Sequence, residues 1–133
     1  MTWFAKLGSL ILIDQLSKWF AIRSGWSIFY NENFAFSLPL PTALMYLIYA
    51  VVLGLMVNYL VKSWHALNPL HRNAWCLVLA GGLSNVCERL VAGNVVDFVP
   101  VPNGMINFAD IFIFIGLVLI IASDRAKKKL NVS

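Results

Sequence analysis

Four apolar stretches, each about as long as a membrane-spanning helix, dominate this sequence and constrain its fold. They cover approximately residues 3–22, 42–62, 73–92 and 106–123, and an α-helix needs about 20 residues to cross a hydrocarbon core of about 30 Å. Only 12% of the residues are charged, compared with about 25% in typical soluble domains. The pattern predicts an all-α membrane protein with four transmembrane helices, forming one integral membrane domain over residues 1–133.

Lysine and arginine residues lie mainly on one side of the predicted membrane. Lys62 and Arg72 flank the connection between the second and third stretches, and a basic tail that includes Arg125 follows the fourth. The first connection has only Arg23, and the third has no Lys or Arg. Because short cytoplasmic loops are enriched in these residues, we predict cytoplasmic termini and outward-facing first and third connections. This topology explains the net charge of +4 without a nucleic-acid partner.

The first outward connection, SGWSIFYNENFAFSLPLP, alternates aromatic and small polar residues. Such alternation predicts a small β-like element on the extracytoplasmic side. Trp26, Phe29 and Tyr30 are expected to lie at the membrane interface, where aromatic side chains gather.

Two histidines and two cysteines are interpreted as structural. His65 and His71 lie in the inward connection and are expected to be solvated. Cys76 and Cys87 fall in one predicted helix, and the chain has no CxxC or metal-ligand spacing. We therefore expect buried, unreactive thiols, and the sequence predicts neither a metal site nor a cofactor.

Polar residues inside the predicted helices are costly in a membrane and often functional. In the first helix, Asp14 and Lys18 are four residues apart and can pair on one helical face. Three polar residues of the third helix also share a side: Asn85, Glu88 and Arg89. Nearby, Gly81 and Gly82 would let a neighbouring helix approach closely. Each polar group is either a structural clamp or the support of a functional site, and both interpretations stay open.

Two aspartates belong to the segment NVVDFVPVPNGMINFAD, which joins the third stretch to the fourth. The predicted topology places Asp97 and Asp110 at the outer face, and the prolines and glycine between them predict a turn. Either aspartate alone could be a helix cap. Their shared depth, together with Asn107 one turn before Asp110, favours a working pair.

Two neighbouring carboxyl groups can hydrolyse a peptide bond without a metal ion. Because two close like charges cannot both ionise, such a pair shares one proton at working pH. The ionised carboxylate takes a proton from water as the water attacks the amide carbonyl, and the protonated carboxyl donates to the developing oxyanion. Asp97 and Asp110 are therefore candidate catalytic residues of an aspartic protease.

Four motifs, in this order, resemble those of the lipoprotein signal peptidases (signal peptidase II), which are membrane aspartic proteases of bacteria. They are DQLSK in the first predicted helix, NENFAFS in the first connection, SNVCERLVAGNVVDF in and after the third helix, and NFAD at the fourth. The resemblance implies an enzyme of the bacterial cytoplasmic (inner) membrane, and we expect it to be monomeric. It implies partners as well, namely membrane lipid and prolipoproteins whose signal peptide is cleaved immediately before a diacylglyceryl-modified cysteine.

The resemblance also implies roles for individual residues, with Asp97 and Asp110 as the catalytic pair. Seven further residues are assigned to substrate binding or to support of the site: Asp14, Lys18, Asn31, Asn85, Glu88, Arg89 and Asn107. The chain departs from the usual motifs at Glu88, where aspartate is usual, and at Asn33, where glycine is usual. The connection between the two aspartates is also shorter than usual.

Two other functions are compatible with the sequence. One is a small proton-coupled transporter with four spans, using Asp14 or Glu88 as its intramembrane carboxylate, although this gives no reason for two aspartates at one depth. The other is a non-catalytic relative that only binds lipoprotein precursors, suggested by Glu88 and the short connection. We predict the peptidase and keep these two functions as alternatives.

Overall fold

The computed structural model describes residues 1–33 and 38–130, and it is largely helical. The helices are α1 (Trp3–Arg23), α2 (Thr42–Ser63), α3 (Pro69–Ala92) and α4 (Phe108–Leu130). The strands are β1 (Phe29–Asn31), β2 (Val95–Asp97), β3 (Val99–Val101) and β4 (Gly104–Ile106). The sequence therefore correctly predicted four helices and a β element in the first connection. Residues 34–37, the second half of the NENFAFS motif, lie outside the described residues.

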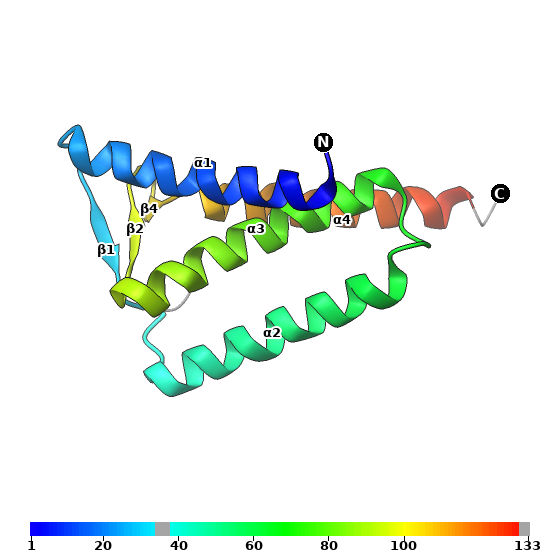
Figure 1. Ribbon diagram of the computed structural model, residues 1–133, viewed down its shortest axis with the longest axis horizontal. Helices are drawn as coiled ribbons and strands as arrows, with labels where there is room; N and C mark the ends of the chain where they lie inside the picture. Colours follow the sequence, from blue (N-terminus) through cyan, green and yellow to red (C-terminus); the bar gives the residue numbers. More distant parts are fainter. Residues whose placement is uncertain (34–37, 131–133) are drawn as a thin grey trace.

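The four helices run lengthwise, with the strands gathered at one end of the molecule (Figure 1). At this strand end, α1 and α3 finish while α2 and α4 begin. Both chain termini and the connection between α2 and α3 lie toward the opposite end. This arrangement brings the segments that carry Asp97 and Asp110 to the same end of the bundle.

Two helices begin at residues other than those predicted, because local capping sets their ends. Helix α3 begins at Pro69, four residues earlier than predicted, and the Asn68 side chain accepts a hydrogen bond from the His71 N–H. An asparagine cap followed by proline is a typical helix start. Helix α4 begins at Phe108 because Gly104–Ile106 forms β4, and α4 continues beyond the predicted residue 123 to Leu130.

Helix α3 is the centre of the bundle and packs closely against α4. A side chain at Gly81 would collide with the backbone oxygen of Ala109, and one at Gly116 would lie 2.7 Å from the backbone oxygen of Ala74. The predicted close approach at Gly81 is therefore confirmed. Such small residues let helix backbones come together where lipid gives no hydrophobic drive for packing.

Helix α2 stands apart from the other three helices (Figure 1). Its buried side chains are Met45 and Leu60, and most of its apolar surface is exposed. By length and composition, α2 and α3 are each able to cross a membrane. An apolar helix exposed on nearly all sides is typical of a lipid-facing span rather than of a soluble core.

The strands form two small antiparallel pairs. In the first pair, β1 lies beside β2, with Phe29 opposite Asp97 and Asn31 opposite Val95. In the second pair, β3 and β4 form a hairpin in which Val99 lies opposite Ile106. This hairpin is the turn that the prolines and glycine predicted, and it returns the chain to the level of Asp97 before α4 begins.

A small apolar cluster fixes the strands to the end of the bundle. Buried Ala21 of α1 packs there with Val96 of β2 and with Phe98, and Phe108 lies partly buried against them. The Phe98 ring also lies 5.9 Å from that of Trp26 and 5.5 Å from that of Phe108, centroid to centroid. Since aromatic pairs at such distances attract each other, the cluster holds β2 in a defined place.

The expectations for one histidine and one cysteine were wrong. His71 is 6% exposed, because α3 extends to include it and α4 covers it. Its Nδ1 atom lies 2.9 Å from the Ser123 hydroxyl, and its Nε2 atom lies 3.1 Å from the Asp124 carboxylate. Cys76 is buried as expected, whereas Cys87 is exposed, because it lines an open cavity together with Ile11 and Gln15 of α1. His65 is exposed, in agreement with the expectation.

Candidate active site

Asp97 ends strand β2 and is almost completely buried, with 2% of its surface exposed. Its Oδ1 atom accepts a hydrogen bond of 2.6 Å from the Asn107 amide. Its Oδ2 atom accepts one of 3.2 Å from the Asn31 amide of β1. Both carboxylate oxygens are thus held by neutral donors, and a carboxylate fixed in this way cannot rotate freely.

Asp110 lies in the first turn of α4. Its Oδ1 atom accepts a hydrogen bond of 2.9 Å from the Asn85 amide of α3, and its Oδ2 atom accepts one of 3.2 Å from the Asn107 N–H. In return, the Asn107 side-chain oxygen accepts from the Asp110 N–H at 3.0 Å. This reciprocal exchange is a capping box, which satisfies two free N–H groups of a helix start.

Asn107 therefore contacts both candidate aspartates. Its side-chain nitrogen donates to Asp97, while its side-chain oxygen and backbone N–H bind Asp110. A helix cap and one member of a pair were both considered for Asp110, and this geometry is compatible with both. Asn107, the residue directly before α4, caps the helix and also holds the two carboxyl groups relative to each other.

The surroundings of Asp97 favour its protonated form. Burial is the main cause and the negative charge of Asp110 the second, and together they raise the pKa of Asp97 to about 6. Hydrogen bonds from Asn107 and Asn31 and the positive charge of Lys18 act in the opposite direction. A carboxyl group with a pKa this close to neutrality can exchange a proton during a reaction near neutral pH.

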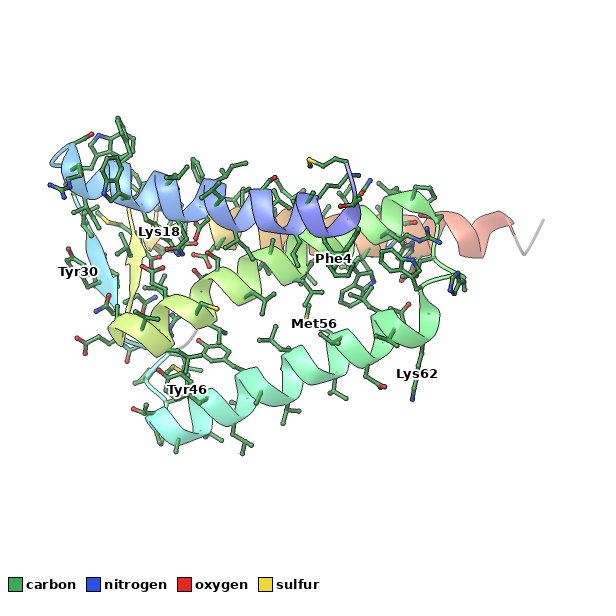
Figure 2. The ribbon with its side chains drawn as sticks, viewed as in Figure 1. Phe4, Lys18, Tyr30, Tyr46, Met56 and Lys62 are labelled. Atoms are coloured by element: carbon green, nitrogen blue, oxygen red, sulfur yellow. The ribbon has the colours of Figure 1, made fainter. Side chains whose placement is uncertain are left out.

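Lys18 lies between α1, β2 and α3 (Figure 2), at the centre of a polar cluster that it forms with Asp14, Asn85 and Glu88. It is 2% exposed, and its ammonium group contacts the carboxylates of Asp14 and Glu88. The third contact of the ammonium group is a hydrogen bond of 3.1 Å to the side-chain oxygen of Asn85. Because that oxygen faces Lys18, the amide nitrogen of Asn85 is directed to Asp110.

Asp14 is fully buried and joins three helices. Its Oδ1 atom accepts from the Ala109 N–H at the start of α4, at 2.8 Å. Its Oδ2 atom accepts from the Ser84 hydroxyl of α3, at 2.7 Å, and pairs with Lys18 at 2.8 Å. The predicted ion pair is confirmed, and a negative charge at a helix N-terminus is stabilising.

Arg89 has different partners from the rest of the cluster. Its guanidinium group donates to the Asn33 backbone oxygen at 2.8 Å and lies 5.7 Å from the centre of the Tyr49 ring. Within residues 1–33 and 38–130, it makes no hydrogen bond with either candidate aspartate. Arg89 thus ties the first connection and α2 to the end of α3.

The structure brings most of the sequence-predicted residues together. Asn31, Asn85 and Asn107 contact the aspartates directly, whereas a second group acts one contact further away: Asp14, Lys18 and Glu88. Sequence reasoning missed the structural role of Ser84, which donates to Asp14 and accepts from Gln15. Its position one helical turn before Glu88, on the polar side of α3, was the available signal.

A model of the family described as Signal peptidase (SPase) II matches residues 7–124. The chain belongs to the signal peptidase II family. The match includes both candidate aspartates and every residue of the polar cluster described above.

Relatives from several bacteria support this assignment. A lipoprotein signal peptidase of Fusobacterium nucleatum is 33% identical over 131 residues, covering 84% of this chain and 79% of the relative. A lipoprotein signal peptidase of Helicobacter acinonychis is 35% identical over 147 residues, covering 96% of this chain and 92% of the relative. The similarity therefore extends over nearly the whole chain.

A solved structure described as a bacterial membrane enzyme, determined by the in meso method, has the same fold. The two structures superpose with a TM-score of 0.83, covering 95% of this chain and 88% of the solved chain, at 22% sequence identity. Together with helices long and apolar enough to span, family membership makes this chain a bacterial membrane enzyme of the aspartic peptidase class.

Proposed function

We propose that this member of the signal peptidase II family removes the signal peptide from diacylglyceryl-modified prolipoproteins, with Asp97 and Asp110 as its catalytic pair. The observation that carries the assignment is the double contact of Asn107, which holds both carboxyl groups at the start of α4. The raised pKa of Asp97, at about 6, supports it, because a pair that works on water must retain one proton near neutral pH.

In the proposed reaction, one carboxylate accepts a proton from water while the water oxygen bonds to the carbonyl carbon of the scissile amide. The other carboxyl group, protonated at the start, donates to the carbonyl oxygen as negative charge develops there. Collapse of the tetrahedral intermediate breaks the C–N bond, and the departing amine takes up a proton from the pair. The reaction consumes one water and needs neither a metal ion nor a cofactor.

The asparagine amides prepare the pair for this reaction. Asn31, Asn85 and Asn107 donate to three different carboxylate oxygens. Donors held in place before the reaction cost no reorganisation when charge moves. We assign these three residues to orientation of the aspartates, and the Asp14–Lys18 pair to support behind them. We assign Arg89 to anchoring of the first connection, which lies near the substrate entrance in this proposal.

The proposed membrane arrangement follows from the position of the strands. All four helices cross the membrane as one domain, both termini are cytoplasmic, and the strand end faces outward. Trp26, Phe29 and Tyr30 are each at least 44% exposed at this end, which suits side chains that lie among lipid headgroups. The acyl chains of a lipid-modified precursor would hold its scissile bond at this same interface, where a monomer has the complete pair.

The transporter alternative is less consistent with the contacts of its candidate carboxylates. Asp14 and Glu88 both contact the Lys18 ammonium group, and Asp14 has further bonds to Ser84 and to the start of α4. A proton carrier must release such partners in each cycle, and releasing Asp14 would free the helix start. We therefore favour a supporting role for both residues.

The decisive experiment is cleavage of a purified diacylglyceryl-modified precursor by the detergent-solubilised protein. We expect the parent to cleave the precursor, and Asp97→Asn and Asp110→Asn to lose at least about a thousandfold in rate, because each removes a group that transfers a proton. Both variants should remain in the membrane fraction. As a matched control, Asn73→Ala changes an exposed residue at the opposite end and should cleave normally.

Two results would contradict the proposal. Cleavage at the parental rate by both aspartate variants would exclude the pair. An inactive parent that still binds the modified precursor would instead indicate the non-catalytic relative considered from the sequence.

A further inference from the structure

Glu88 makes two contacts that connect the polar cluster to strand β2. One carboxylate oxygen, Oε2, pairs with the Lys18 ammonium group. The other, Oε1, accepts a hydrogen bond of 3.0 Å from the Val96 backbone N–H. The Glu88 side chain is 11% exposed, so both contacts are largely shielded from solvent.

Val96 directly precedes Asp97 in the buried strand β2. On its other side, β2 is fixed by β1, where Asn31 also donates to Asp97. The hydrogen bond from Val96 to Glu88 therefore reaches the backbone one residue before Asp97. Any shift of this peptide would move the Asp97 carboxyl group relative to Asp110.

We propose that Glu88 is a positioning residue that sets the place of β2, and with it Asp97, relative to the Lys18 cluster that orients Asn85 and Asp110. The inference rests on the proposed function of the two aspartates. The Oε2 atom of Glu88 contacts Lys18, which holds the Asn85 amide that donates to Asp110. The Oε1 atom accepts from the N–H of Val96, which directly precedes Asp97. Glu88 thus sets the separation of the pair without contacting either aspartate.

The length of the glutamate side chain is essential for this role. Aspartate, the residue expected here from the family motif, is one methylene shorter and would have to give up Lys18 or the Val96 N–H unless the backbone moved. Glutamate reaches both partners with the backbone as it stands. The length of Glu88 therefore fits the position of β2 in this chain, and the departure from the family motif preserves both contacts.

The charge of Glu88 has a separate effect on the pair. The charged groups that face this cluster are Asp14 and Lys18 from α1, Glu88 from α3, Asp97 from β2 and Asp110 from α4. Lys18 lowers the pKa of Asp97, and Glu88 offsets part of that positive charge. Removing the negative charge of Glu88 should therefore lower the pKa of Asp97 further, whereas shortening the side chain with its charge retained should not.

Two substitutions separate reach from charge. Glu88→Asp keeps the charge and both acceptor oxygens but shortens the side chain. Glu88→Gln keeps the length and loses the charge, and its single oxygen can accept from Lys18 or from the Val96 N–H but not from both. We expect Glu88→Asp to lower kcat by about 10- to 100-fold, as small misplacements of catalytic groups do, with KM within about twofold and the alkaline limb of the pH profile in place. We expect Glu88→Gln to shift the alkaline limb toward lower pH, because Asp97 would lose the retained proton more readily.

Cleavage of the diacylglyceryl-modified precursor across the pH range tests this, with Cys87→Ala as the matched control. Cys87 is the exposed neighbour of Glu88, and its variant should keep the parental kcat and pH profile. With an active parent, parental kcat and pH profile in both Glu88 variants would overturn the inference and leave the proposed function intact. Equal losses of thermal stability and rate in both variants, with no shift of the alkaline limb, would also overturn it, because they indicate a purely structural role. An inactive parent would overturn the proposed function itself.

Discussion

The two ends of the helix bundle differ in how deeply their charged residues are buried and in how many polar partners each has. At the strand end, Asp14, Lys18 and Asp97 are at most 2% exposed, and each has at least two polar partners. At the opposite end, polar residues meet in separate pairs that reach solvent, such as Lys6 with Asn73 and His71 with Asp124, which is 66% exposed. Burying charge is costly unless every group is paired. Under the proposed function, the strand end keeps its buried charges for the reaction, whereas the polar pairs of the opposite end join helices.

The largest difference in kcat should appear between Asn107→Ala at the strand end and Asn73→Ala at the opposite end. Loss of Asn107 removes the hydrogen bond to Asp97 and the cap on Asp110 together, so we expect kcat to fall by about 100-fold or more. Loss of the cap should lower the free energy of unfolding by about 1 kcal/mol. Precursor cleavage and thermal unfolding in detergent measure both effects. Equal activity in the two alanine variants would remove the distinction between the ends.

A second contrast concerns stability against pH. The pKa of Asp97 is raised from 3.8 to about 6 in the folded protein, so the folded state binds the proton more tightly than the unfolded state. Its stabilising contribution is complete below about pH 4 and is lost as the pH rises through 6. Asp97→Asn is neutral at every pH. At pH 7 its free energy of unfolding should therefore exceed that of the parent by up to about 3 kcal/mol, although the variant should be inactive.

The measurement is the difference in thermal stability between parent and Asp97→Asn at pH 4 and pH 7. The two proteins should differ less at pH 4, where Asp97 is protonated, than at pH 7. A difference that does not change with pH would show that Asp97 titrates normally and would weaken its assignment to the pair.

The smallest effect is expected for His71→Gln at the opposite end. Glutamine can retain one of the two contacts, with Ser123 or with Asp124. We therefore expect a loss of about 1 kcal/mol in the free energy of unfolding and a cleavage rate within about twofold of the parent. A large loss of activity without unfolding would mean that the two ends are coupled.

Local features of the sequence predicted much of this structure. Apolar stretches indicated the helices, the spacing of Asp14 and Lys18 indicated their ion pair, and the prolines indicated the turn before Asp110. The Asn68–Pro69 helix start is also a local feature, a cap followed by proline, but the apolar pattern begins only at residue 73. Each of these features depends on residues a few positions apart, where spacing determines geometry.

The remaining features depend on contacts between distant parts of the chain. The pairing of β1 with β2, which places Asn31 against Asp97, joins segments separated by two helices. The hydrogen bond from the Val96 N–H to Glu88 involves a backbone group that no side-chain pattern reveals. His71 was expected to be solvated because it was assigned to the inward connection; the structure includes it in α3, where Ser123 of α4 contacts it.

The position of Asn107 links the activity of this protein to the completion of its fold. An α4 whose first turn is unwound lacks the capping box, and under the proposed mechanism it also lacks an aligned pair of aspartates. In that mechanism, hydrolysis requires the start of α4 to be seated against Asp14 of α1 and Asn85 of α3, so the peptidase activity would appear only as the last helix packs.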